Sequence, residues 1–349
     1  MVKKLDILFA LGRPFSPLYG SAMKVREQLY KKGLFRSHTL SVPVISIGNL
    51  VLGGTGKTPT VQHIAKLLSD AGKSPAIISR GYGGSARNKI NIVSDGKTQQ
   101  LSADAAGDEP YMLAQSLKHI PVLTGTRRIF PCRHAVNTYG SDILILDDGF
   151  QHLAVQRDID LVLFDATYLA GNSRIFPGGP LREPVSSLSR CHAFIITGIL
   201  DNNTERAERF RELLKVRYPG KPIFFARHEK AKILHGNGRE LENVSGLKCY
   251  GFCGIANPAR FSESLKRLNI ELTGVYHLKD HTTYTQKLIE KLSSLAFADR
   301  ADCFITTQKD YVKLQNLKLS LPIFILDHGY CIEDSFISYL LEKISEFGR

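Results

Sequence analysis

Residues 48–59 read GNLVLGGTGKTP, and this glycine-rich stretch decides the fold. It follows the apolar run 42–47, which is rich in β-branched residues and typical of a buried strand. It precedes the run 60–68, whose apolar residues have the spacing of one face of a helix. A strand, a glycine-rich turn, a Lys-Thr pair and a helix form the context of a P-loop. The sequence therefore predicts a site for nucleotide phosphates.

Each part of this motif has an expected role. Backbone N–H groups of the turn would bind phosphate oxygens, and they belong to Gly53, Gly54, Thr55 and Gly56. Lys57 would reach the β- and γ-phosphates, and the Thr58 hydroxyl would ligate Mg²⁺. The strict pattern has glycine at position 51, where this chain has Val51. A structural turn with a solvated lysine is the alternative, but the flanking strand and helix favour the nucleotide site.

Apolar strand patterns alternate with helical patterns along the rest of the chain. The predicted strands include residues 74–80, 142–148, 160–165, 193–197, 248–255, 303–307 and 323–326. Continuous apolar strands that alternate with helices indicate a parallel sheet covered on both faces. We therefore expect an α/β fold with a P-loop NTPase-like, mostly parallel sheet, a smaller C-terminal α/β subdomain and an N-terminal amphipathic helix. The predicted boundaries are 1–36 for the helical segment, 37–220 for the P-loop core and 221–349 for the C-terminal subdomain.

Composition limits the classes of partner. The formal net charge of +13 suits nucleic acid, anionic lipid or phosphorylated small molecules. Zinc-finger spacing, an RNA-binding signature and a long Lys/Arg block are all missing, so we expect no nucleic-acid partner. The six cysteines form no CxxC pair and predict reduced, mostly buried thiols. No apolar run reaches the length of about 18 residues that spans a bilayer, and no signal-peptide pattern is present, so we expect a cytoplasmic protein.

The segment 18–35 interleaves apolar residues with lysine and arginine. This pattern is typical of an amphipathic basic helix that lies on a membrane surface. An ordinary amphipathic helix packed on the domain is the alternative, and the charge does not decide between the two.

Several polar residues are candidates for the chemistry. Asp147 and Asp148 end an apolar strand, where an acid beside a P-loop can hold Mg²⁺ directly or through water; a simple Asp-Gly turn is the alternative. Asp108 precedes Glu109 and a proline at a predicted helix start, which ordinary capping explains equally well. Arginines that would clamp phosphates, or lie solvated at the surface, are Arg127, Arg128, Arg174 and Arg182. The stretch 307–310 is faintly similar to base-reading loops, and Asp310 is predicted to act as a helix cap instead.

Taken together, these motifs resemble those of one family, tetraacyldisaccharide 4′-kinase, the lipid A 4′-kinases of Gram-negative bacteria. The motifs that carry the resemblance occur in the family's order, at residues 48–49, 53–59, 79–84, 107–110, 147–152, 179–184, 252–258, 280–281 and 309–310. The family also lacks the first glycine of the strict P-loop pattern, so Val51 agrees with it.

The resemblance implies a reaction and a location. We expect transfer of the ATP γ-phosphoryl group to the 4′-hydroxyl of a lipid A disaccharide 1-phosphate, with ATP and Mg²⁺, in lipopolysaccharide biosynthesis. The partners would be the glycolipid substrate and an anionic membrane surface. The enzyme would be peripheral, at the cytoplasmic face of the bacterial inner membrane, with the N-terminal helix helping it to dock.

The resemblance also assigns roles to single residues. Asp108 matches the family's catalytic acid and would accept the hydroxyl proton, with His281 raising its basicity or orienting it. Arg128 and Arg182 would neutralise charge on the transferring phosphoryl group. The carboxylates expected near Mg²⁺ are Asp147, Asp148 and Glu183. Many relatives have a second histidine after His281, where this chain has Thr282, so that second histidine has no counterpart here.

Two other classes of protein remain as alternatives. A P-loop GTPase or metallochaperone-like switch protein would also have this loop and a strand that ends in carboxylates. A basic membrane- or nucleic-acid-binding protein that holds a nucleotide structurally is the non-enzymatic alternative. Neither explains the motifs at 107–110, 181–184 and 280–281 together.

Overall fold

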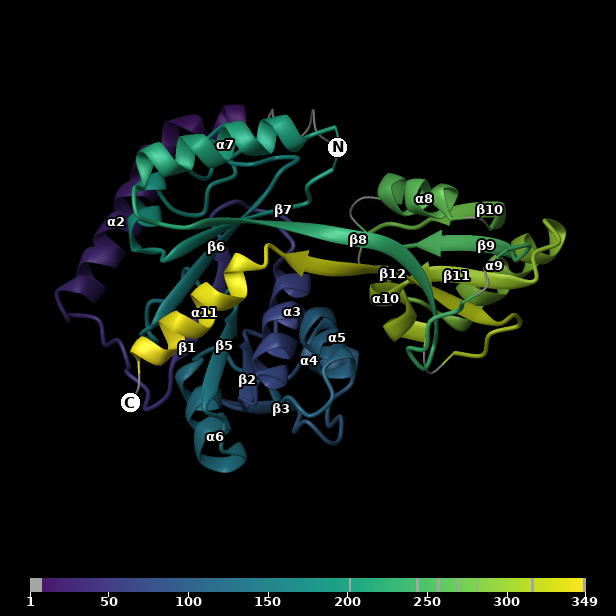
Figure 1. Ribbon diagram of the computed structural model, residues 1–349, viewed down its shortest axis with the longest axis horizontal. Helices are drawn as coiled ribbons and strands as arrows, with labels where there is room; N and C mark the ends of the chain where they lie inside the picture. Colours follow the sequence, from purple (N-terminus) through teal and green to yellow (C-terminus); the bar gives the residue numbers. More distant parts are fainter. Residues whose placement is uncertain are drawn as a thin grey trace. The chain divides into compact units, whose positions relative to one another are not determined.

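The computed structural model describes residues 8–200, 202–242, 245–255, 258–268, 270–280, 282–314 and 317–347, and the chain divides into two compact units. The first unit contains the chain up to Arg227 and from Tyr330 onward, and the second runs from His228 to Gly329 (Figure 1). Two strands, β8 (Ile223–His235) and β12 (Ile323–Ile332), each have residues in both units.

The first unit is built on a mostly parallel sheet, as predicted. Its strands are β1 (Val44–Asn49), β2 (Pro75–Ser79), β3 (Asn91–Ser94), β4 (Val122–Thr124), β5 (Ile143–Asp147), β6 (Ile159–Asp165) and β7 (Ala193–Thr197). Neighbouring strands follow the order β8-β7-β6-β1-β5-β2-β4-β3. Every pairing in this series is parallel except that of β3 with β4. The strand that enters the P-loop, β1, therefore lies in the interior of the sheet between β6 and β5.

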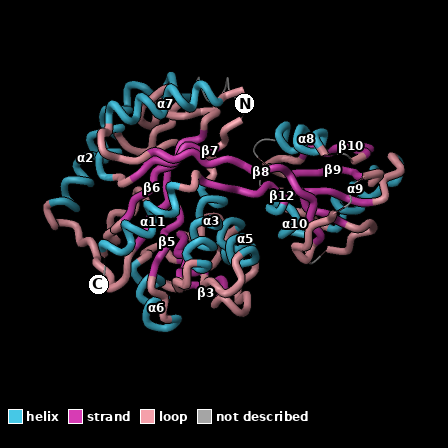
Figure 2. The backbone as a smooth tube through the Cα atoms, in the orientation of Figure 1, coloured by secondary structure: helices cyan, strands magenta, loops and turns pink. Residues whose placement is uncertain are grey.

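Helices cover both faces of this sheet (Figure 2). The helices of the first unit are α2 (Ser16–Lys31), α3 (Lys57–Asp70), α4 (Ala103–Ala106), α5 (Asp108–Ser116), α6 (Ile129–Tyr139), α7 (Thr204–Arg217) and α11 (Ser335–Glu346), with 3₁₀ turns η1 (Arg13–Phe15) and η2 (Val185–Arg190). Successive side chains of a strand point to opposite faces. Accordingly, Ile145 of β5 packs in a core with α3, α5 and α11, and the adjacent Leu144 packs in another core with α6.

The N-terminal helix α2 is present where the amphipathic pattern predicted it. Gly20 is its one buried residue, and its apolar Leu18 and Val25 are exposed. Within the described part of the chain, no helix combines the length and the apolar character needed to cross a membrane.

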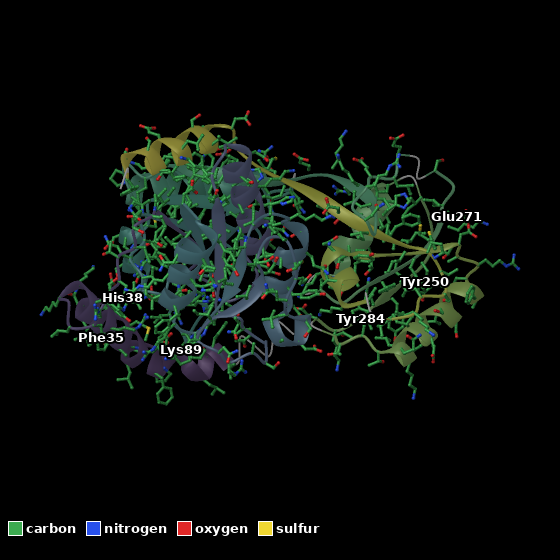
Figure 3. The ribbon with its side chains drawn as sticks, turned by 90° about the horizontal axis from the view of Figure 1, so that it is seen from below. Phe35, His38, Lys89, Tyr250, Glu271 and Tyr284 are labelled. Atoms are coloured by element: carbon green, nitrogen blue, oxygen red, sulfur yellow. The ribbon has the colours of Figure 1, made fainter. Side chains whose placement is uncertain are left out.

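The second unit repeats the α/β arrangement on a smaller scale. It contains β9 (Lys248–Cys253), β10 (Glu271–His277), β11 (Cys303–Thr307), α8 (Pro258–Arg267), α9 (Gln286–Ala298), α10 (Gln308–Tyr311) and η3 (Val312–Leu314). Neighbouring strands follow the order β10-β9-β11-β12, and all of these pairs are parallel. Tyr250 and Tyr284, both labelled in Figure 3, pack in the core beside α9, and α8 packs in a separate core. The predicted strands of this half are therefore confirmed.

All six cysteines are free thiols, and five of them are buried. This outcome agrees with the expectation from their spacing.

Candidate functional site

The loop between β1 and α3 has the backbone conformation of a phosphate-binding turn. Gly53 and Gly56 have φ angles of 117° and 74°, which side-chain-bearing residues rarely adopt. A Cβ at Gly56 would also lie 3.2 Å from the Thr197 hydroxyl. The Asn49 side chain holds the loop by donating to the carbonyl oxygens of Val51 (2.7 Å) and Gly53 (3.3 Å). The loop is therefore fixed by interactions of its own chain.

Position 51 has a structural function in this loop. Val51 is 5% exposed and packs in the core beside Leu181, with which it forms an isolated β-bridge. Valine suits this position because the residue supports the loop from inside the fold.

The segment 180–182 lies against the same loop. Leu52 N–H donates to the Pro180 carbonyl at 2.7 Å, and Arg182 N–H donates to the Leu50 carbonyl at 2.8 Å. These two hydrogen bonds place Arg182 beside the P-loop, although the two segments are far apart in the sequence.

Lys57 is the first residue of α3, and its ammonium group lies near the carboxyl end of β5. Its Nζ atom is 3.3 Å from Asn49 Oδ1 and 3.7 Å from Asp148 Oδ1. The predicted phosphate-binding lysine is thus next to Asp148, one of the three carboxylates predicted near Mg²⁺.

Asp147 is a buried carboxylate with one unsatisfied oxygen. It is 2% exposed, and its Oδ2 accepts a hydrogen bond from Ser79 Oγ at 3.1 Å. Its Oδ1 is buried without a hydrogen-bond partner. Burial, followed by the negative charges of Glu109 and Asp148, raises the pKa of Asp147 to about 6. A carboxylate in this situation is stabilised by a nearby cation, and this supports the fit of Mg²⁺ to the site.

Asp148 has the opposite electrostatic environment. Burial alone would raise its pKa, but the positive charges of Lys57 and Arg182 outweigh burial and lower the pKa. Arg182 Nη1 donates to both carboxylate oxygens, at 2.9 and 2.8 Å. Asp148 also has a φ of 50°, in the left-handed region, which directs the chain sharply at the end of β5.

Arg128 completes this group of charges. It is 3% exposed, and its Nη1 donates to the Asp148 carbonyl oxygen at 2.9 Å. Burial lowers the pKa of its guanidinium, and the charges of Asp147 and Asp148 oppose this effect. The Nε atoms of Arg128 and Arg182 are buried without a hydrogen-bond partner. The two guanidinium groups nevertheless bring positive charge to the carboxyl end of β5, which suits an anionic ligand.

Asp108 is the first residue of α5, and the helix cap is Gly107, whose φ is 91°. A Cβ at Gly107 would lie 2.4 Å from the Tyr82 carbonyl oxygen, so the turn requires glycine and packs against the segment 81–84. The charge of Glu109 contributes to the raised pKa of Asp147, so this turn lies within electrostatic reach of the carboxylates.

Glu183 is placed among arginines. It is 3% exposed and forms ion pairs with Arg190 and, at 3.7 Å, with Arg26 of α2. It therefore links α2 to the end of the 180–183 segment, and its role near Mg²⁺ stays a prediction. In the described ranges no three His, Cys, Asp or Glu side chains gather as a metal-binding group. Mg²⁺ commonly takes only one or two protein carboxylates, with phosphate and water completing its shell.

His281 lies outside the described residues, so its role also stays a prediction. The prediction that Asp310 caps a helix is wrong. The N-cap of α10 is Thr307, whose side chain accepts a hydrogen bond from Asp310 N–H. Asp310 is fully buried and accepts hydrogen bonds from Gly254 N–H and Thr307 Oγ1, at 2.9 and 2.8 Å. A carboxylate engaged in this way is not available to read a nucleotide base.

Three functional residues had no role assigned from the sequence. Asn49 and Ser79 end strands β1 and β2, and Thr197, which ends β7, donates to the Thr55 carbonyl oxygen at 3.0 Å. The signal that would have found them is a polar residue at the carboxyl end of an apolar strand, because ligands of parallel sheets bind at that edge.

Comparisons with known proteins agree on one family. The family model described as tetraacyldisaccharide-1-P 4′-kinase matches residues 8–345. The chain is 44% identical over 348 residues to a tetraacyldisaccharide 4′-kinase of Desulfotalea psychrophila, covering 100% of both chains. It is 39% identical to one of Syntrophotalea carbinolica, covering 91% of this chain and 87% of that protein. A crystal structure of LpxK from Aquifex aeolicus in complex with ATP superposes with a TM-score of 0.79 at 30% identity, covering 96% of this chain and 98% of that chain.

Proposed function

The chain belongs to the tetraacyldisaccharide-1-P 4′-kinase family, and from this we infer that it transfers the γ-phosphoryl group of ATP to the 4′-hydroxyl of a tetraacyldisaccharide 1-phosphate. It is a phosphotransferase of lipid A biosynthesis, with an alcohol as acceptor. The observation that carries this function is the meeting of Lys57, Asp148 and Arg182 beside the P-loop. The two cations complement the negative charge of a transferring phosphoryl group, and the carboxylate suits Mg²⁺.

We propose that ATP and Mg²⁺ are held at the carboxyl edge of the first sheet. The backbone of residues 53–56 would bind the phosphates, and Lys57 would contact the γ-phosphate. Thr58, Asp147 and Asp148 would hold Mg²⁺ directly or through water, with Glu183 as a further predicted carboxylate. Mg²⁺ bound there would neutralise charge on the phosphate oxygens.

Asp108 is our proposed general base. As the 4′-oxygen forms its bond to the γ-phosphorus and the bond to the β–γ bridging oxygen breaks, the Asp108 carboxylate would take the hydroxyl proton, and ADP would leave. Arg128 and Arg182 would neutralise negative charge on the transferring group with their guanidinium groups. His281 would orient the base or raise its basicity.

We propose that α2 and the helical residues 8–15 before it contact an anionic membrane surface at the cytoplasmic face of the inner membrane. Leu11 and Leu18 are 71% and 74% exposed there, so both apolar side chains are available to enter a membrane surface. A groove of about 530 Å³ lies along α2, lined by Arg13, Ser16, Lys24, Arg174, Ile175 and Pro184. Its mixture of cationic and apolar groups suits a phosphorylated glycolipid.

Transfer of label tests the function. Purified protein is incubated with γ-labelled ATP, Mg²⁺ and a detergent-dispersed tetraacyldisaccharide 1-phosphate. We expect label at the 4′ position, and none without Mg²⁺. Protein that binds ATP but labels no lipid would refute the proposal and favour a nucleotide-driven switch.

A further inference from the structure

The helix α2 presents apolar side chains to solvent along one side. Leu18, Ala22 and Val25 follow one another at intervals of four and three residues, and all three are exposed. Polar side chains on another side of the helix form hydrogen bonds or ion pairs with other segments of the first unit: Ser16, Tyr19, Arg26 and Glu27. A surface helix ordinarily packs on its protein by an apolar side. In α2 the side that the protein holds is polar instead.

Tyr19 of α2 holds the backbone of the arginine beside the P-loop. Its hydroxyl donates to the Arg182 carbonyl oxygen at 3.1 Å. The N–H of the same arginine donates to the Leu50 carbonyl oxygen, and its guanidinium donates to Asp148. Arg182 is therefore fixed from both directions, by the P-loop through its N–H and by α2 through its carbonyl oxygen.

Arg26 of α2 bridges the two segments that supply Asp148 and Arg182. Its Nη2 donates to the Gln151 carbonyl oxygen at 2.9 Å, and its Nη1 lies 3.7 Å from Glu183 Oε1. The Gln151 side chain in turn donates to the carbonyl oxygen of Asn49, the last residue of β1, at 2.9 Å. One side chain of α2 thus contacts both the turn after β5 and the residue that follows Arg182.

Arg190 of η2 forms a second bridge between the same segments. It donates to the Glu183 carboxylate and, at 3.1 Å, to the Phe150 carbonyl oxygen, and its guanidinium lies 4.2 Å from the centre of the Phe150 ring. Its Nη1 is 3.6 Å from Glu27 Oε2 of α2. A buried carboxylate such as Glu183 is costly unless it is paired, so the two arginines fix the position of this segment.

We propose that Tyr19, Arg26 and Arg190 are positioning residues, through which α2 fixes Arg182 beside Asp148 for phosphoryl transfer. The proposal rests on the proposed role of Arg182 at the transferring phosphoryl group. A guanidinium that stabilises this group must be held within a fraction of an ångström, so loosening its segment lowers the rate of the chemical step. The helix α2 is then part of the framework of the active site, in addition to its proposed contact with the membrane.

Tyr19→Phe is the first test, because it removes only the hydroxyl. Its matched control is Tyr30→Phe on the same helix, since Tyr30 is also half-buried and its ring contact with Phe35 is kept by phenylalanine. With detergent-dispersed substrate, Tyr19→Phe should lower kcat about fivefold while KM for ATP and the melting temperature stay near wild type. Tyr30→Phe should leave kcat unchanged. An unchanged kcat in Tyr19→Phe would overturn the proposal.

Arg26 provides a second, independent test. Arg26→Met should lower kcat on the order of tenfold, because it removes the contacts with both Gln151 and Glu183. The control is Arg209→Met, which removes an exposed arginine and its ion pair with Glu205 from another helix of the same unit. If Arg26→Met loses no more activity than Arg209→Met, Arg26 does not position the site.

The Arg182→Ala background separates this inference from the function on which it rests. If Tyr19 acts through Arg182, Tyr19→Phe should lower kcat in the wild type and cause no further loss in Arg182→Ala. Additive losses would make Tyr19 merely structural and overturn the inference alone. A near-normal rate in Arg182→Ala would overturn the proposed role of Arg182, and the inference with it, while the kinase activity itself stood.

Discussion

Asp147 and Asp148 are adjacent in the chain, yet their carboxylates have opposite electrostatic environments. Asp147 is enclosed and faces other carboxylates, which raises its pKa to about 6, whereas the charges of Lys57 and Arg182 lower the pKa of Asp148. The difference arises because Asp147 ends the buried strand β5, whereas Asp148 follows the strand with a left-handed φ of 50° and lies beside Lys57 and Arg182. The two neighbouring acids therefore differ in how readily they bind a proton.

At the residue scale, Asp108 is expected to carry the proton transfer. Asp108→Asn should lower kcat by about 10²- to 10⁴-fold, because the amide cannot accept the hydroxyl proton. ATP binding should persist, since the P-loop is unchanged. The measurement is kcat from lipid phosphorylation beside ATP affinity from calorimetry, with the exposed Asp104→Asn as control. A near-normal kcat in Asp108→Asn would exclude this residue as the base.

His152 gives a prediction about pH. Burial, followed by the charges of Arg128 and Arg157, lowers the pKa of His152 from 6.5 to about 3. Because the folded state keeps His152 neutral while the unfolded state binds a proton below about pH 6.5, this residue makes the protein less stable as pH falls from about 6.5 toward 3. Between pH 7 and 5 its contribution is about 2 kcal/mol at most.

The measurement is the free energy of unfolding by urea at pH 7 and pH 5. His152→Asn should make the difference between the two values smaller than in the wild type. His119→Asn is the control, since His119 is exposed and its φ of 71° is one that asparagine tolerates. An identical pH difference in wild type and His152→Asn would show that His152 titrates normally.

At the scale of elements, the β1–loop–α3 unit depends on the backbone of Gly56. Gly56→Ala should destabilise the protein by about 1–2 kcal/mol, because its φ of 74° is unfavourable for alanine and the new Cβ would crowd Thr197. Gly54→Ala should change stability little, because its φ is not positive and nothing lies within 4 Å of its Cβ position. Thermal unfolding without nucleotide compares the two, and equal losses would disprove the backbone argument.

The helix α2 should contribute to membrane binding through its exposed apolar residues. Leu18→Asp should weaken co-sedimentation with vesicles that contain anionic lipid, and leave the melting temperature unchanged because Leu18 is 74% exposed. Leu213→Asp on α7 is the matched control, since Leu213 is exposed on a different helix of the same unit. If both variants bind the vesicles equally well, α2 does not contact the membrane and only packs on the rest of the protein.

At the scale of the whole molecule, the described nucleotide machinery lies within the first unit. The P-loop, Asp147, Asp148, Arg128 and Arg182 all precede residue 228. ATP with Mg²⁺ should therefore slow amide hydrogen exchange most at residues 50–58 and 147–150, and removal of the metal with a chelator should reverse much of that protection. Protection that is greatest in residues 228–329 would contradict this assignment of the nucleotide site.

Local patterns in the sequence determined the strands, the P-loop and the pair Asp147–Asp148. Each of these depends on a few consecutive residues: an apolar run, glycines where φ must be positive, and an acid at the end of a strand. The motif order also determined the family and the expected reaction. The strands, the P-loop and the acid pair can be predicted because each depends on interactions within its own short segment of the chain.

Only the tertiary structure decided which distant residues share the site. Arg182 pairs with Asp148 because the segment 180–182 forms hydrogen bonds with Leu50 and Leu52 of the P-loop. No pattern in either segment predicts that pairing. Glu183 forms ion pairs with Arg190 and Arg26, and Asp310 accepts from the backbone after another strand. Such partners are chosen by the packing of parallel strands that are remote in sequence, so the pKa of each acid, and hence its chemistry, is a property of the folded chain.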